Sequence, residues 1–274
     1  MASSDRAAAV RRLKGLRGTL VPLVTPVDEH RRVCASSVER LMRSLRGEVT
    51  GYVPALSTGE GWTLTPEQWA DMVRLTVEHA DGAPVLAGAA LGDVAGILAR
   101  ARLAAGLGAD AVVVPPPFPG ADGRRRGLVD HFTEILDGSP LPVFVYHEHV
   151  VSGAPLDIDA LREVCDLPGI VGVKDSGGSA EFTRDLLGNA AGVPVFQGWE
   201  QLLTRAPGVS GFVGPLADLE PSVCAAALAR PGEEVQARVD ELSEHHRLLA
   251  DDWYLHVKAE LVRRGVIGTA LAVD

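Results

Sequence analysis

Short apolar runs recur along the chain, each bounded by turn residues and separated by stretches with helical spacing of apolar positions. Such runs predict strands that are buried on both faces. Eight of them occur, at Thr19–Thr25, Gly51–Pro54, Pro84–Gly88, Ala111–Val114, Pro142–Tyr146, Ile170–Lys174, Pro194–Gln197 and Gly211–Val213. The intervening stretches predict helices, for example over Pro66–Ala80, Val94–Gly106 and Leu128–Leu136.

Helix-start signals support this reading. Thr65 stands before Pro66 and three residues before Gln68, which predicts an N-cap with proline in the first turn. Eight strand–helix units predict an α/β fold, a (β/α)8 TIM barrel. The chain turns wholly helical after Pro221, which predicts additional C-terminal helices packed on the barrel. An open, doubly wound sheet is the alternative, but no G-x-G-x-x-G follows the first strand.

The organisation expected is one domain in three parts. Residues 1–18 form an N-terminal arm or cap, 19–229 the barrel, and 230–274 the C-terminal helices. A length of 274 residues suits one such barrel domain. The N-terminal residues lack a continuous apolar core, so neither a signal peptide nor a membrane span is expected.

The net charge and the cysteine content indicate which classes of partner and which compartment to expect. The net charge of −10 argues against a nucleic-acid or anionic-membrane partner, because both require a basic surface. The three cysteines are widely spaced and show no disulfide or zinc-binding pattern. We therefore expect a cytoplasmic protein that acts on small molecules.

Barrel enzymes carry their chemistry at the carboxyl ends of the strands. This rule selects a set of polar and aromatic candidates that follow the predicted strands. They are Thr25-Pro26, Ser57-Thr58-Gly59-Glu60, Phe118, Tyr146 to His149, Lys174 to Ser176, Gly198 to Glu200, and Asp218.

Lys174 stands out because arginine fills nearly every other cationic position, and the chain has only three lysines. A desolvated lysine can act as a nucleophilic amine, whereas arginine stays protonated. An amine that attacks a ketone gives an iminium ion, and Tyr146 could relay the protons. The Ser57-Thr58-Gly59 turn could hold the carboxylate of a 2-keto acid. A strand-end lysine that reaches solvent is the alternative for Lys174.

These residues resemble the dihydrodipicolinate synthase / N-acetylneuraminate lyase family of Schiff-base class I aldolases. The motifs that carry the resemblance are Leu56-Ser57-Thr58-Gly59-Glu60, Gly108-Ala109-Asp110 with Pro116-Pro117, Tyr146, Gly172-Val173-Lys174-Asp175 and Gly198-Trp199-Glu200. The resemblance runs from about Gly18 to Pro221 and is weaker beyond, at Val257 to Leu261. It implies that Lys174 forms the imine, Tyr146 moves protons, and Ser57, Thr58 and Gly59 bind the keto-acid carboxylate. It also implies that Ser176, Gly198 and Glu200 line the substrate pocket, with Glu200 toward a hydroxylated tail.

The chain also departs from the family pattern. Val151-Ser152-Gly153 stands where dihydrodipicolinate synthases carry Arg-Thr-Gly, so the arginine for the aspartate-semialdehyde carboxylate is absent. Phe118 and Pro119 replace a tyrosine pair, and phenylalanine cannot relay a proton. Phe118 would instead shape the pocket. Dihydrodipicolinate synthesis itself is therefore disfavoured.

Other readings of the site stay open. His147 and His149, two residues apart, would line the pocket and select a polar or acidic substrate tail; a metal-dependent aldolase is the less favoured reading. We expect a pyruvate-type lyase acting on a 2-keto acid and an aldehyde, with no metal or organic cofactor. An imine-dependent dehydratase of a deoxy sugar acid, a decarboxylating lyase and a catalytically idle keto-acid-binding relative are alternatives. The resemblance further implies a homo-oligomer, a tetramer or a dimer.

Overall fold

Eight parallel strands form the centre of the molecule. The computed structural model describes residues 3–119, 127–150, 152–154, 157–189 and 192–274. The strands are β1 Gly18–Val21, β2 Gly51–Tyr52, β3 Leu86–Gly88, β4 Ala111–Val114, β5 Val143–Glu148, β6 Ile170–Ser176, β7 Val195–Gln197 and β8 Gly211–Phe212. They follow the order β2-β1-β8-β7-β6-β5-β4-β3, and a parallel bridge between Tyr52 and Val85 joins the two edges. The sheet is thus a nearly closed barrel, as the apolar runs predict.

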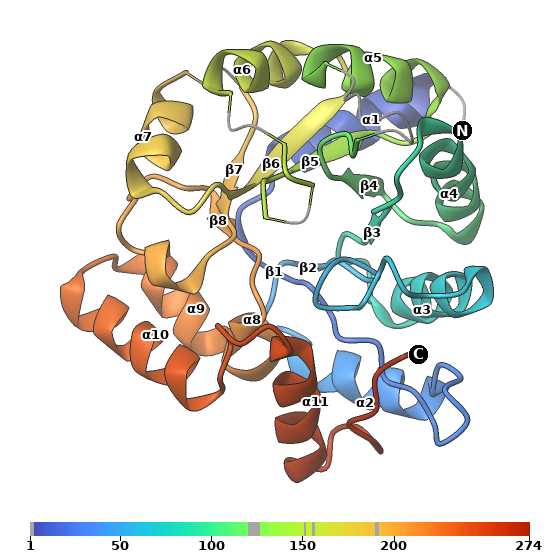
Figure 1. Ribbon diagram of the computed structural model, residues 1–274, viewed down its shortest axis with the longest axis vertical. Helices are drawn as coiled ribbons and strands as arrows, with labels where there is room; N and C mark the ends of the chain where they lie inside the picture. The colour runs from blue at the N-terminus through green and yellow to red at the C-terminus, as the bar shows by residue number, and fades with distance from the viewer. Residues whose placement is uncertain (1–2, 120–126, 151, 155–156, 190–191) are drawn as a thin grey trace.

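Helices surround the strands on the outside (Figure 1). They are α1 Ser3–Lys14, α2 Ala35–Leu45, α3 Pro66–His79, α4 Val94–Leu107, α5 Leu128–Gly138, α6 Ile158–Asp166, α7 Ala180–Asn189, α8 Leu216–Leu219, α9 Pro221–Ala229, α10 Glu233–His245 and α11 Trp253–Arg263. The predicted helix start at Thr65 is confirmed. Its hydroxyl accepts from the Gln68 backbone N–H at 3.2 Å, and the Gln68 side chain accepts from the Thr65 backbone N–H at 2.8 Å. None of the described helices is long and apolar enough to cross a membrane.

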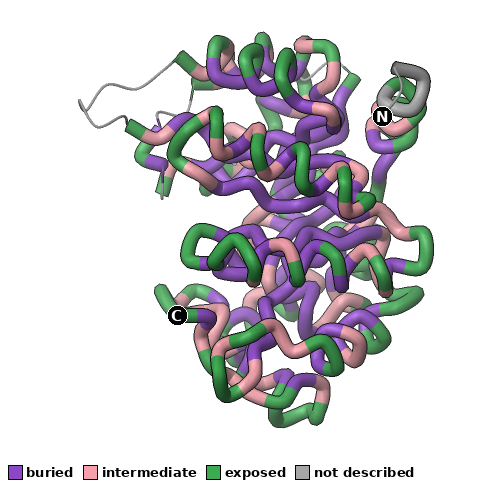
Figure 2. The backbone as a smooth tube through the Cα atoms, turned by 90° about the vertical axis from the view of Figure 1, so that its right-hand side faces the viewer, coloured by how far each residue is buried: buried purple, intermediate pink, exposed green. Residues whose placement is uncertain are grey.

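The core has two layers, because strand side chains alternate between the two faces of the sheet. One layer lies between the strands and the helices, where residues such as Val112, Val143 and Phe132 pack. The other fills the barrel interior with Leu20, Val53, Leu86, Val113, Phe144, Val171, Phe196 and Val213. The strands accordingly run as buried segments through the molecule, with exposed residues on the outer helices (Figure 2).

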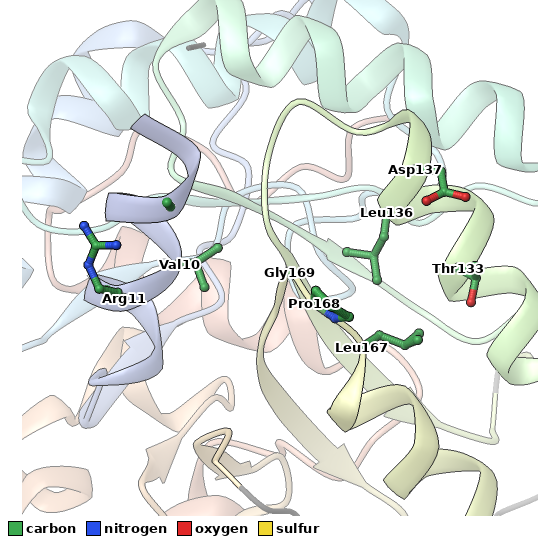
Figure 3. A pocket seen from close by; sticks show the side chains of 9 residues that line it. Val10, Arg11, Thr133, Leu136, Asp137, Leu167, Pro168 and Gly169 are labelled. Carbon is green, nitrogen blue, oxygen red and sulfur yellow. The ribbon is translucent and has the colours of Figure 1, made fainter. Parts of the chain in front are cut away.

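The amino-terminal end of the barrel is closed by α1, which lies within the expected arm of residues 1–18. Leu13 of α1 and Leu16 pack against the interior side chains. A hollow of about 650 Å³ lies beside this closure, between α1, α5 and the turn that leads into β6 (Figure 3). Its described lining holds no lysine, histidine or cysteine, so it offers no nucleophile of the kind that Lys174 provides.

The expected division between residues 229 and 230 falls between α9 and α10. After α11 the chain returns along α2 and α3, and the C-terminus lies beside these helices (Figure 1). The returning tail is held by hydrogen bonds to its backbone. Arg31 donates to the Ala272 carbonyl at 2.7 Å, and the Gln68 side chain donates to the Val273 carbonyl at 3.0 Å.

A register shift between β5 and β6 sets which side chains face each other. Val143 pairs with Ile170, but Phe144 pairs with Gly172, so β6 contributes one extra residue at this point. Beyond the irregularity, Tyr146 pairs with Lys174. Gly172 has no room for a side chain, since a methyl group there would lie 2.3 Å from the Phe144 ring.

This contact generates a prediction about stability. Replacing Gly172 by alanine forces the new methyl group against Phe144, whose ring is already packed edge-on against Phe196. We expect a loss of roughly 1–3 kcal/mol in the free energy of unfolding, as for other overpacked cores. Urea denaturation measures it. Gly106→Ala on α4 is the matched control, because no atom lies within 4 Å of that position; an equal loss in both variants would contradict the assignment.

Candidate active site

The carboxyl ends of the strands surround a cavity of about 200 Å³. It is lined by residues from five strand ends and from the segment between α10 and α11. The described lining residues are Ser57, Thr58, Trp62, Tyr146, Glu148, Val150, Lys174, Ser176, Gly198, Trp199, Glu200, Pro215, Leu248, Leu249, Ala250, Asp251 and Trp253. The barrel therefore gathers most of the sequence-predicted site residues in one place.

Lys174 and Tyr146 lie side by side in this cavity. Their strands are paired at these two residues, and the Lys174 Nζ lies 4.1 Å from the centre of the Tyr146 ring. Lys174 is only 4% exposed. The Tyr146 hydroxyl is 3.4 Å from the Ser57 Oγ, so the phenol and the alcohol are within hydrogen-bonding distance, while the Lys174 amine lies over the ring of the same tyrosine.

The turn after β2 presents polar groups to the cavity. Ser57 and Thr58 line the cavity. Across the described residues, no protein acceptor takes the backbone N–H of either one. Gly59 lies behind them and does not line the cavity. A methyl group on Gly59 would lie 2.7 Å from the Leu23 carbonyl oxygen, so the absence of a side chain is what lets this turn pack against β1.

A buried ion pair supports this turn from behind. Glu60 follows Gly59 directly, with its backbone in the left-handed region at φ 57°, and its carboxylate pairs with the Lys258 ammonium of α11. The second carboxylate oxygen accepts from the Val273 backbone N–H at 2.9 Å, and Lys258 also donates to the Leu271 carbonyl at 2.8 Å. Burial lowers the pKa of Lys258, and the Glu60 carboxylate opposes that shift. The Ser57-Thr58-Gly59 turn is thereby tied to α11 and to the C-terminal tail.

Ser176, Gly198 and Glu200 complete the opposite wall, as the sequence motifs imply. A methyl group on Gly198 would lie 2.1 Å from the Ser176 Oγ and 3.0 Å from the Lys174 Cε, so glycine keeps the space that the lysine occupies. The Glu200 carboxylate accepts from the Leu216 backbone N–H at 3.1 Å. Burial raises the pKa of Glu200 to about 7, although the Leu216 N–H and the Lys174 charge oppose this.

His147 and Phe118 do not line the cavity, contrary to the sequence-based expectation. His147 points to the other face of β5, where its Nδ1 is 3.1 Å from the Asp175 Oδ1 and its ring stacks on Phe182. The reason is the two-residue alternation of a strand: Tyr146 faces the cavity, so His147 faces the helices. Phe118 is half-buried in the segment after β4. Among the described residues, no group of three or more histidine, cysteine or carboxylate side chains forms a metal site.

The remaining geometric candidates have structural partners. Asp218 is buried, and its carboxylate accepts from the Val24 backbone N–H at 3.3 Å. The Thr25 hydroxyl donates to the Gly59 carbonyl at 2.7 Å. Val151, which stands at the missing arginine, lies outside the described residues.

Sequence reasoning gave part of the lining no role. Glu148 lies within the strand-end segment Tyr146 to His149 but was not assigned to the pocket; it faces the cavity because β5 continues to this residue, two positions beyond Tyr146. Extending the predicted strand by two residues would have shown its direction. Leu248, Leu249, Asp251 and Trp253 come from a segment far along the chain with no strand-end signal, and only the tertiary fold brings them here.

Comparison with known proteins identifies the family. The model of the dihydrodipicolinate synthetase family matches residues 15–271. The chain belongs to this family. A 4-hydroxy-tetrahydrodipicolinate synthase of Acidiphilium cryptum is 33% identical over 76% of this chain and 73% of its own length. That of Xylella fastidiosa is 32% identical over 92% of this chain and 86% of its own.

Solved structures agree in fold. Dihydrodipicolinate synthase of Acinetobacter baumannii, crystallised with pyruvate, superimposes with a TM-score of 0.84 at 24% identity, covering 94% of this chain and 91% of its own. The Clostridium difficile protein CdNal, crystallised with mannosamine, gives a TM-score of 0.82 at 17% identity, covering 91% and 89%. Family membership makes this chain an enzyme of the pyruvate-dependent aldolase type.

The buried ion pair between Glu60 and Lys258 yields a stability prediction. Lys258→Ala leaves the Glu60 carboxylate buried without its partner, and we expect a loss of about 3–5 kcal/mol in the free energy of unfolding. Urea denaturation measures it. Arg238→Ala, which breaks the exposed pair with Glu241, is the control and should change stability by less than about 1 kcal/mol. Equal losses of stability in the two variants would show that the buried Glu60–Lys258 pair contributes no more to folding than an exposed ion pair.

Glu200 yields a pH-dependent prediction. The pKa of Glu200 is about 7 in the folded protein and 4.5 ordinarily, so keeping this carboxyl group buried costs free energy of folding wherever the unfolded chain would ionise it. This cost is absent below pH 4.5, grows as the pH rises to 7, and is constant above pH 7. Glu200→Gln removes the penalty, so the variant should gain stability relative to the unmodified protein with rising pH, by on the order of 3 kcal/mol. Urea denaturation between pH 4.5 and pH 8 measures the difference. The exposed Glu241→Gln is the control, and a pH-independent difference for Glu200→Gln would refute the prediction.

Proposed function

We propose that this enzyme forms an imine between the Lys174 Nζ and a 2-keto acid of the pyruvate type, and uses it to make or break an adjacent carbon–carbon bond. The observation that carries the proposal is the pairing of Lys174 with Tyr146 on neighbouring strands, inside one cavity with Ser57 and Thr58. The cavity supplies a nucleophile, a proton relay and an anion-binding edge, which are the three parts that imine chemistry requires.

We assign each part a step in this reaction. The backbone N–H groups and hydroxyls of Ser57 and Thr58 receive the carboxylate, so that the keto carbon faces the Lys174 Nζ. The neutral amine adds to the carbonyl, and the Tyr146 hydroxyl delivers the proton that converts the resulting alcohol into leaving water. Ser57, at 3.4 Å from the Tyr146 hydroxyl, continues the relay.

The iminium ion then acts as the electron sink. Loss of a proton from the neighbouring carbon gives an enamine, which attacks an aldehyde, and the reverse sequence cleaves the bond. Because Lys174 itself supplies the sink, the proposed route uses neither metal nor organic cofactor. Hydrolysis of the product imine returns the free amine.

The acceptor is a separate question from the imine. Curated relatives are 4-hydroxy-tetrahydrodipicolinate synthases, yet this chain has Val151 where the resemblance places the arginine for the aspartate-semialdehyde carboxylate. Phe118 likewise cannot supply a proton in place of the family's tyrosine. We therefore propose an aldolase or lyase reaction with a different acceptor. Assembly into a homo-oligomer stays a prediction.

Borohydride trapping tests the imine. With pyruvate present, reduction should add the mass of a reduced pyruvate adduct to Lys174, as read by mass spectrometry of peptides. Lys174→Ala should give no adduct, and the mass-spectrometric assignment of the modified peptide distinguishes Lys174 from Lys258, the other buried lysine. Tyr146→Phe keeps the ring but removes the proton relay, and we expect trapping to slow by roughly 100-fold or more.

The outcomes separate the rival functions. An adduct on Lys174 without turnover of any aldehyde indicates an idle keto-acid-binding relative, and an adduct with loss of water from a deoxy sugar acid indicates a dehydratase. The absence of any adduct, or an adduct on Lys258 instead, would overturn the proposed function.

A further inference from the structure

We propose that the acceptor is a small, uncharged aromatic aldehyde, so that the carbon–carbon bond joins a pyruvate unit to an aryl-bearing carbon. This inference rests on the proposed imine at Lys174. It comes from the outer half of the same cavity, which the proposed imine chemistry leaves unused.

The outer wall is apolar and aromatic. Three of the chain's four tryptophans, Trp62, Trp199 and Trp253, line this one cavity. The fourth, Trp69, is buried in the core and donates to the Gly88 carbonyl. Tryptophan faces provide large, rigid surfaces on which another aromatic ring stacks.

Exposed apolar side chains also gather at this mouth. The described residues leave six large hydrophobic side chains exposed: Trp62, Leu103, Val150, Leu249, Val262 and Leu271. Three of them, Trp62, Val150 and Leu249, line the cavity. Leu249 is 56% exposed and Val150 is 67% exposed. A concentration of exposed apolar surface around a pocket marks a binding surface for an apolar group.

Two of the indole N–H groups already have protein acceptors. The Trp199 Nε1 donates to the Ser176 carbonyl at 2.9 Å, and the Trp253 Nε1 donates to the Thr58 Oγ1 at 3.4 Å. Their polar edges are thus engaged in positioning the walls, and what they offer a ligand is the ring face.

The charges of the cavity disfavour an anionic acceptor. Among the described lining residues Lys174 is the one cation, and the imine engages it. Three carboxyl groups share the lining: Glu148, Glu200 and Asp251. An aldehyde that carries a carboxylate would approach these groups, and the described lining offers no second cation to receive it.

A hydroxylated aldehyde is another class of acceptor that carboxyl groups can bind. Here, however, the two buried carboxyl groups already accept backbone hydrogen bonds, Glu148 from the Ser152 N–H at 3.0 Å and Glu200 from the Leu216 N–H at 3.1 Å. The cavity of about 200 Å³ is also smaller than the roughly 300–1,000 Å³ of sites for drug-sized ligands. A keto acid plus one flat ring suits it better than a branched polyol.

The proposed carbon–carbon bond forms between the enamine and the aromatic aldehyde. The enamine carbon attacks the aldehyde carbon, the new carbon–carbon bond forms, and the carbonyl electron pair moves to oxygen, which takes the proton of the Tyr146 hydroxyl. Water then hydrolyses the iminium ion, and the proton released returns to the Tyr146 phenolate; this frees Lys174 as the neutral amine and releases a 4-aryl-4-hydroxy-2-keto acid. The reverse sequence cleaves this compound to pyruvate and the aromatic aldehyde.

An aldehyde panel tests the inference. The full-length protein is incubated with pyruvate and benzaldehyde, glyceraldehyde, succinic semialdehyde or aspartate semialdehyde, and the hydroxy-keto acid is quantified by mass spectrometry. We expect kcat/KM for benzaldehyde to exceed that for each other aldehyde by about tenfold or more. A preference for either semialdehyde or for glyceraldehyde overturns the inference.

A matched pair of variants sharpens the test. Leu249→Arg places a cation on the apolar wall and should shift the benzaldehyde-to-succinic-semialdehyde ratio of kcat/KM toward the anion by about tenfold. Leu103→Arg makes the same change at an exposed leucine of α4 outside the cavity and should leave the ratio unchanged. Equal ratios in the two variants contradict the inference.

Direct binding separates this inference from the proposed function. Because three of the four tryptophans line the cavity, benzyl alcohol, an unreactive analogue, should quench the intrinsic fluorescence in a saturable manner. Leu249→Arg should weaken this binding and Leu103→Arg should not. Saturable quenching without a borohydride adduct would refute the imine while supporting the aromatic site, and an adduct without quenching would do the reverse.

Discussion

The register between β5 and β6 is the constraint on which the chemistry of this barrel depends. The extra residue in β6 shifts the pairing so that Tyr146 stands opposite Lys174 rather than Val173. Gly172 makes this arrangement possible, because the Phe144 ring occupies the space where its side chain would be. A glycine two residues before the lysine therefore contributes to the site through packing, without contacting a substrate.

A second constraint acts on the other side of the cavity. The Ser57-Thr58-Gly59 turn is buried, and Glu60 attaches it to Lys258 and to the backbone of the C-terminal tail. Two buried charges are costly to keep apart, so the pair holds the turn and the tail in one arrangement. The C-terminal helices are thus part of the site: they supply Trp253 to its wall and fix the turn that faces Lys174.

The fold and part of the candidate site could be predicted from the sequence. Each of the eight apolar runs overlaps a strand, because a parallel strand buried on both faces must be apolar throughout. Lys174 and Tyr146 followed from the rule that barrel chemistry lies at strand ends. The same rule could not place His147, because it names a segment and not a direction: the alternation along β5 turns His147 away from the cavity and Glu148 toward it. Leu249 and Trp253 could not be predicted, since no local pattern tells which helix ends lie over a barrel mouth.

The part of the site proposed to bind the keto acid and the part proposed to bind the acceptor come from different kinds of element, and this difference affects how substrate specificity can change. Lys174 and Tyr146, the groups proposed to act on the keto carbon, stand on neighbouring strands, where backbone pairing fixes their positions tightly. The groups proposed to meet the acceptor stand at helix ends and loops, where a substitution such as that of Leu249 changes a contact without moving a strand. A barrel of this kind can therefore keep its imine chemistry constant while its acceptor changes. In the proposed reaction, Val151 at the position of the arginine and the three tryptophans of the lining act in the same direction, since a pocket without that cation favours a neutral ligand only if apolar surface takes its place.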